Sequence, residues 1–148
     1  MDMREILLYF SMKYEGQFKK IYEALQYKES VDTESFYENK RRIKHKNIVV
    51  TDLNYPNFLK TVNCPPFTLF YQGNPKLLNH SAEIRTMIED GTRCLVNVEP
   101  VMKNGRVEFD YVFACENHDN LDDVIQHMMN KGLNFKQYNQ LRKSQPER

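Results

Sequence analysis

The sequence predicts a small α+β protein in which an N-terminal helical module precedes a small mixed α/β sheet with a C-terminal β-hairpin. Three observations support this prediction. Apolar residues recur at helical spacing near the N-terminus, short β-branched runs follow, and two alternating segments flank Asn104-Gly105. A chain of 148 residues can bury a core, and we divide it into a helical module at 1–46 and a mixed α/β module at 47–148.

Three helices are expected in the first module. Residues 3–14 and 17–27 place apolar side chains three and four positions apart, and Gly16 separates the two segments as a turn. A third helix should begin with Asp32 or Thr33 as its N-cap and run through Lys44. Its apolar face consists of Phe36, Tyr37 and Ile43.

Two short strands should follow, at 47–51 and 66–71. A helical turn at 55–62, with Pro56 at its first position, joins them. Short strands bridged by a helix predict a parallel pair. A short helix is then expected over 81–90, ended by Gly91.

The hairpin is the clearest local signal. Residues 93–103 and 106–116 flank Asn104-Gly105, which is typical of a two-residue type I′ turn. With this turn, opposed residue numbers sum to 209, and the even positions from Cys94 to Met102 face apolar partners at every step. This register predicts one unbroken apolar face against the core. It also places Pro100 at a site without hydrogen bonds to the hairpin partner, so the first strand should lie at a sheet edge there.

A final helix should open at Asn120-Leu121-Asp122-Asp123, which is similar to a capping box. Its inward residues are Leu121, Val124, Ile125 and Met128. Gly132 should end it, and residues 133–138 predict a further strand.

One segment resembles a known family. Tyr55-Pro56-Asn57-Phe58-Leu59 and, after a spacer, the stretch from Pro65 to Leu78 (PPFTLFYQGNPKLL) resemble the DNA-processing protein A (DprA, or Smf) family. The resemblance implies a helical N-terminal region leading into a Rossmann-like domain that binds single-stranded DNA, with a recombinase as a further partner. The family's continuation into a glycine-rich turn is missing here, because His80 to Arg85 stand in its place and the five glycines never cluster.

Catalytic and cofactor motifs are absent from the sequence. There is no dinucleotide fingerprint and no P-loop, so we expect no cofactor and no enzymatic activity. Three cysteines without a C-x-x-C pair indicate a reducing, cytoplasmic compartment, and no apolar run is long enough to span a membrane. Cys115, His118 and His127, with Cys94 as a fourth ligand, could hold zinc, or they could pack as ordinary core and surface residues.

Two charged groups are the candidate binding sites. The basic run Lys40, Arg41, Arg42, Lys44 and Lys46 could bind nucleic-acid phosphates or only complement a helix dipole. On the polar face of the hairpin, Glu99 faces Asp110, with Glu108 and Glu116 on the same side. These carboxylates predict either a site for a basic protein surface or a solvated face.

The sequence therefore predicts a non-catalytic small protein that resembles a truncated DprA. We expect it to act near DNA processing or recombination and to be encoded by a phage or mobile element. Its partner would be weakly bound single-stranded DNA. The alternative is a protein-binding inhibitor or decoy that uses Glu99, Glu108 and Asp110.

Overall fold

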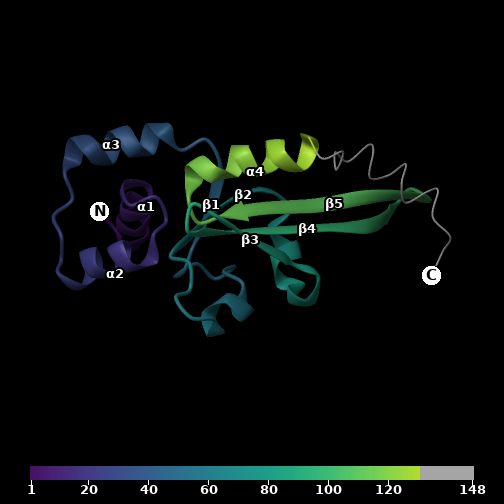
Figure 1. Cartoon of the computed structure of the whole chain (residues 1–148), viewed down its shortest axis with the longest axis horizontal. Helices are drawn as coiled ribbons and strands as arrows, with labels where there is room; N and C mark the ends of the chain where they lie inside the picture. The colour runs from purple at the N-terminus through teal and green to yellow at the C-terminus, as the bar shows by residue number, and fades with distance from the viewer. Residues whose placement is uncertain (131–148) are drawn as a thin grey trace.

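The computed structural model describes residues 1–130 and has an α+β fold, as predicted. Helices α1 (Met3–Lys13), α2 (Phe18–Gln26) and α3 (Thr33–Arg42) lie together at one end (Figure 1). A five-stranded antiparallel sheet follows, in the order β1-β2-β5-β4-β3. Its strands are β1 (Lys46–Val49), β2 (Thr68–Gly73), β3 (Arg85–Glu89), β4 (Thr92–Lys103) and β5 (Arg106–Cys115). Helix α4 (His118–Asn130) covers one face of the long β4–β5 hairpin.

The three N-terminal helices form where the apolar spacing predicts them. Asp2 accepts a hydrogen bond from the backbone N–H of Glu5 and caps α1, and Asp32 caps α3 in the same way through Ser35. Helix α3 ends at Arg42 rather than Lys44, because Ile43 already has an extended backbone that leads into β1. Gly16 forms the turn between α1 and α2 at φ +74°, as expected.

The predicted parallel pairing of the first two strands is wrong. β1 and β2 are antiparallel, with Lys46 opposite Tyr71 and Val49 opposite Thr68, and Val50 N–H donates to the Phe67 carbonyl beyond them. A parallel connection needs a crossover, usually a helix of a dozen residues or more in all. The connecting segment holds only a 3-10 turn at Asn57–Thr61, and it folds back on itself instead.

The helix predicted over 81–90 is also wrong. Only Ser81–Glu83 form a 3-10 turn, and β3 follows and pairs with β4. Asp90 and Gly91 both have positive φ angles, 49° and 79°, so they form a tight hairpin turn of the kind that Asp-Gly favours. The sequence signal was therefore present, and it outweighs the weak helical spacing before it.

The predicted hairpin register is confirmed, from Cys94 opposite Cys115 to Lys103 opposite Arg106. Asn104 and Gly105 both have positive φ, as a type I′ turn requires. The expectation of one apolar face wholly in the core is only half right. Cys94 and Val96 are buried, whereas Met102 near the tip is 68% exposed, because the hairpin extends beyond the rest of the sheet (Figure 1).

The sheet is buried on both faces near the base of the hairpin. One face, with Cys94, Phe113 and Cys115, packs against Met12 of α1 and Leu121 of α4. On the opposite face, Leu95, Val112 and Ala114 pack against the connections between β1 and β2 and between β2 and β3. These connections supply Tyr55, Leu59, Leu77 and Leu78. A third cluster, which includes Phe10 and Ile21, holds the N-terminal helices together.

The last helix begins at His118, two residues earlier than the predicted cap. Leu121 and Val124 are buried and Ile125 and Met128 partly so, as its spacing predicts. The predicted end at Gly132 and the strand at 133–138 lie outside the described residues.

Candidate nucleic-acid interface

The basic run lies where the end of α3 passes into the edge strand β1, and the fold divides its members into two sets. Arg42 and His45 turn toward the first two turns of α4. There, Arg42 Nη2 lies 3.2 Å from Asp119 Oδ2, and His45 Nε2 lies 2.9 Å from Asp122 Oδ1. Both acids lie at the N-terminal end of α4, where negative charge is favoured by the helix dipole.

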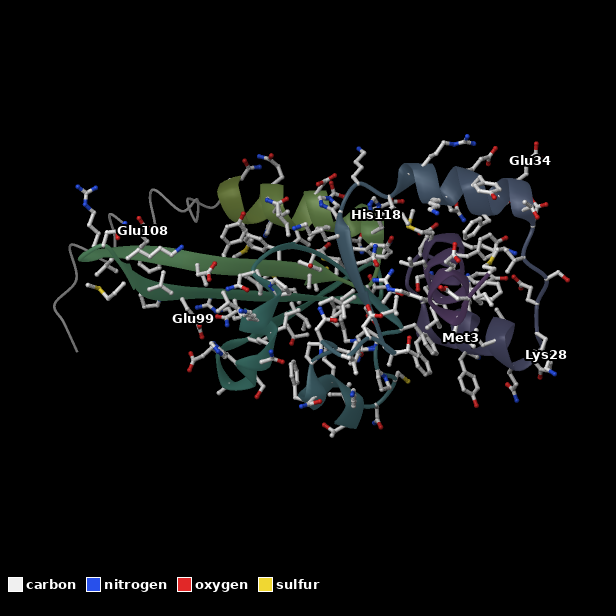
Figure 2. All side chains as sticks on the ribbon, turned by 180° about the vertical axis from the view of Figure 1, so that it is seen from behind. Met3, Lys28, Glu34, Glu99, Glu108 and His118 are labelled. Atoms are coloured by element: carbon white, nitrogen blue, oxygen red, sulfur yellow. The ribbon has the colours of Figure 1, made fainter. Side chains whose placement is uncertain are left out.

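The backbone of this segment is fixed to α4 by His118. The Lys44 N–H donates to His118 Nε2 at 3.0 Å, so this ring nitrogen carries no proton. The other ring nitrogen, Nδ1, lies 3.2 Å from Asp119 Oδ1, and the ring meets Phe70 edge to face. Figure 2 shows His118 at this junction between the helical end of the molecule and the sheet. The backbone of the basic segment is thus bonded to the start of α4.

The second set, Lys40, Arg41, Lys44 and Lys46, is exposed. Within residues 1–130 none of these four side chains forms an ion pair. Lys40 Nζ lies 5.8 Å from the centre of the Phe36 ring, so its stem packs on an aromatic face while its charge remains accessible. We call these four residues the basic face.

Tyr37 adds an exposed aromatic ring to the basic face. The sequence placed Tyr37 on the apolar side of its helix, but its exposed fraction is 54%, and it lies four residues before Arg41 on the same side of α3. Its ring meets Phe36 edge to face, which holds it in place. An exposed ring beside cations is the combination on which single-stranded bases stack. Helical spacing alone misassigned Tyr37, because the apolar side of this helix is too narrow to include it.

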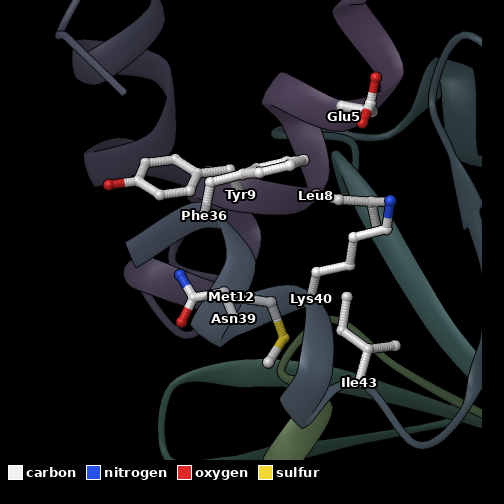
Figure 3. Close-up of a pocket in the computed structure, with 8 residues that line it drawn as sticks. All are labelled: Glu5, Leu8, Tyr9, Met12, Phe36, Asn39, Lys40 and Ile43. Atoms are coloured by element: carbon white, nitrogen blue, oxygen red, sulfur yellow. The ribbon is translucent and has the colours of Figure 1, made fainter. Parts of the chain in front are cut away.

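A shallow apolar groove between α1 and α3 adjoins the basic face (Figure 3). It has a volume of about 40 Å³. Leu8, Met12 and Ile43 line it, and the stem of Lys40 runs along it. The rings of Tyr9 and Phe36 at this groove are 3% and 8% exposed, so they serve packing rather than base stacking.

The acidic residues of the hairpin have mostly internal partners. Glu99 Oε2 lies 2.7 Å from His80 Nδ1, and Asp110 Oδ2 accepts a hydrogen bond of 2.7 Å from the Asn74 amide. Both of the carboxylates that face each other across the strands therefore have hydrogen-bond partners within the fold. Glu108 near the tip is exposed (Figure 2).

Glu116, placed by the sequence on this acidic face, is buried instead. It forms a two-pronged ion pair with Arg93, with Arg93 Nη2 2.7 Å from Oε1 and Nε 3.1 Å from Oε2. The same guanidinium donates to the carbonyls of Asn63 and Cys64. The pair therefore holds the loop before β2 against the base of the hairpin, which is a structural role.

The candidate zinc ligands do not converge. Cys94 and Cys115 are buried opposite each other and joined by a thiol hydrogen bond, which together with burial raises the pKa of Cys115. His118 Nε2 accepts a hydrogen bond from the Lys44 N–H, and His127 is exposed. Within residues 1–130, no three Cys, His, Asp or Glu side chains are placed to hold a metal ion.

The DprA-like segment supplies core residues rather than a surface site. Tyr55, Leu59, Leu69, Leu77 and Leu78 all belong to one buried cluster. The Tyr55 hydroxyl donates to the Pro66 carbonyl at 2.7 Å, and its burial raises its pKa.

The end of that segment turns the chain under the hairpin. Gly73 has a φ of +103°, and a Cβ there would lie 2.2 Å from the Tyr111 carbonyl oxygen, so only glycine fits. Asn74 N–H donates to the same carbonyl at 2.7 Å. The buried apolar residues of this segment and its Gly73-Asn74 turn thus have structural roles.

Comparison with known proteins finds no matching family model, curated protein or solved structure. The relation to DprA stays a prediction. None of the helices in the described part of the chain has the length and apolar character needed to cross a membrane.

Proposed function

We propose that this is a non-catalytic protein that binds single-stranded DNA weakly through its basic face and acts near DNA processing or recombination. The observation that supports the proposal best is the division of the basic run. Arg42 and His45 are paired with acids of α4, whereas Lys40, Arg41, Lys44 and Lys46 are exposed without such partners among the described residues. The resemblance of residues 55–78 to DprA supports the same function. In keeping with it, we propose a phage or mobile element as the source of the chain.

The expected affinity is modest. Four phosphate contacts release few counterions, and non-specific complexes of this kind typically have dissociation constants of about 1–100 μM at physiological salt. Stacking of one base on Tyr37 would add about 1–3 kcal/mol and favour single strands over duplexes, whose bases are already stacked.

Charge reversal with a matched control tests the proposal. We expect R41E/K44E to abolish binding of a fluorescent single-stranded oligonucleotide at low salt, measured by anisotropy. The control K19E/K20E changes net charge equally at exposed positions of α2 and should bind like the wild type. Equal loss in both variants would indicate that only net charge matters, and no binding by the wild type would contradict the proposal.

Tyr37 distinguishes single-strand binding from a general attraction to phosphates. We expect Y37A to weaken single-stranded binding by about tenfold, in line with the loss of one stacked base, and to leave duplex binding unchanged. Y22A is the control, because Tyr22 is 51% exposed on α2, away from the basic face. Equal effects of Y37A on both DNA forms would argue against stacking.

The alternative function is binding of a basic protein surface by Glu99, Glu108 and Asp110. Glu99 is in contact with His80, and Asp110 accepts a hydrogen bond from Asn74. Glu108 is therefore the accessible carboxylate of the three. The geometry therefore supports the DNA proposal better.

A further inference from the structure

Strand edges of the sheet lie on β1, on β3, and on the outer parts of β4 and β5, which extend beyond β3 and β2. The edges on β1 and β4 are blocked. On β1, Val50 N–H donates to Phe67, so by alternation the groups of Asn47 and Val49 face away from β2. Arg4 Nη2 donates to the Asn47 carbonyl at 3.2 Å, and the Val49 N–H donates to Asp52 Oδ2 at 3.0 Å. These side-chain contacts satisfy the β1 edge and prevent another strand from pairing there.

The outer half of β4 is blocked by Pro100. Glu116 N–H donates to the carbonyl of Arg93, the residue opposite it. Because hydrogen-bonded pairs alternate in an antiparallel ladder, the odd residues of β4 bond to β5. The backbone N–H and C=O groups of the even residues therefore point toward β3. β3 pairs with β4 only as far as Val96, so Pro100 lies on the free edge beyond, as its missing N–H predicts. Proline within an edge is a known means of preventing strand addition.

The outer edge of β3 has no such protection. By the same alternation, Arg85, Met87 and Glu89 bond to β4, and the backbone groups of Thr86 and Ile88 point outward. Within residues 1–130, no side chain or backbone group bonds to them. The Thr86 side chain is exposed, and the Ile88 side chain is 65% exposed, so another strand can reach this edge.

The charge pattern of β3 fits a second copy of the same strand. When two copies pair antiparallel about Met87, Thr86 lies opposite Ile88 of the other copy, and the outward N–H and C=O groups of both meet in register. In the same register Arg85 lies opposite Glu89 on both sides of the two-fold axis, and such opposite-charge pairs stabilise adjacent strands. A strand of unrelated sequence would not be matched at both ends in this way.

We propose that the protein forms a two-fold symmetric dimer by antiparallel pairing of β3 with β3 of a second copy, in the register that places Met87 opposite Met87. The two five-stranded sheets then form one continuous sheet. The β3 edge lies apart from the basic face at α3 and β1, so the dimer presents two basic faces to a DNA strand.

Charge exchange tests the register. Sedimentation velocity over a range of concentrations should show a shift from the 17.7 kDa monomer to a species of twice that mass. Because each single reversal creates two like-charge pairs, R85E or E89R should weaken dimerisation by about tenfold, and R85E/E89R should restore it. A wild-type protein that stays monomeric up to millimolar concentration, or a dimer insensitive to both single variants, would overturn the proposal.

Amide hydrogen exchange tests which edge is used. The N–H groups of Thr86 and Ile88 should exchange fast in dilute protein and become protected as concentration rises. Met87 N–H, bonded to β4, should be protected throughout, and Met102 N–H, on the edge blocked by Pro100, should show no dependence on concentration. Protection of Thr86 and Ile88 already in the monomer would show that another part of the same chain covers this edge, and would overturn the dimer.

Discussion

At the scale of single residues, contacts made far along the chain decide what each charged or polar group does. Glu116 and Glu108 lie on the same side of β5, yet Glu116 is buried against Arg93 and Glu108 is exposed. Arg41 and Arg42 are neighbours, yet only Arg42 is paired with α4. Sequence patterns predicted the run and the strand but not these divisions, because the partners lie 23 and 77 positions away.

The Arg93–Glu116 pair should contribute strongly to stability. Removing Glu116 leaves the partly buried Arg93 guanidinium without its carboxylate partner, so E116A should lower the free energy of unfolding by about 3 kcal/mol, measured by urea titration. R42A breaks the exposed pair with Asp119 and should cost less than about 1 kcal/mol. Similar losses in the two variants would contradict the structural role assigned to Glu116.

Thiol reactivity should separate the three cysteines. Cys64 is exposed, whereas Cys94 and Cys115 are buried, and the raised pKa of Cys115 disfavours the reactive thiolate. We expect a colorimetric thiol reagent at pH 8 to modify only Cys64 in the folded protein and all three cysteines in denaturant.

The raised pKa of Cys115 also predicts how the stability of the protein depends on pH. The unfolded chain releases the Cys115 proton more readily than the folded one, so stability should be complete below about pH 8.5 and fall above it. In the thiol-reagent experiment, rapid modification of all three cysteines without denaturant would contradict the burial of Cys94 and Cys115.

At the scale of elements, local signals predicted most of the fold. The cap of α3, the Asn104-Gly105 turn and the register of the hairpin were all predicted, because each depends on residues close in sequence. The parallel pair and the helix over 81–90 were wrong for different reasons. Pairing direction depends on how the long connection folds back. The Asp90-Gly91 turn decides the structure of 81–90, although the helical spacing of these residues predicted a helix.

Gly16 tests how closely the helical end and the sheet approach. A Cβ at Gly16 would lie 2.5 Å from the Glu116 carbonyl oxygen, whereas a Cβ at Gly105 would meet nothing within 4 Å, although both have a φ of +74°. G105A should therefore cost only the backbone strain of about 1–2 kcal/mol, and G16A clearly more. Chemical denaturation compares the two variants, and equal losses would show that the α1–α2 turn does not contact the β5 end.

At the scale of the whole molecule, a scaffold of helices and sheet presents an exposed cationic segment at the junction of α3 and β1. Residues 55–78, on which the predicted relation to DprA rests, contribute mainly to the core of this scaffold. The cationic segment was predictable as a run of charges. The exposed ring of Tyr37 was not, because its exposure depends on how α3 packs on α1.

The salt dependence of single-stranded DNA binding tests the central claim most directly. Four phosphate contacts predict that the logarithm of the binding constant falls with the logarithm of salt concentration at a slope of about −3, because each contact on a single strand contributes about −0.7. Removing two contacts with R41A/K44A should reduce the slope by about 1.4, and K19A/K20A should leave it unchanged. A slope near zero, or one unaffected by R41A/K44A, would contradict binding through the basic face.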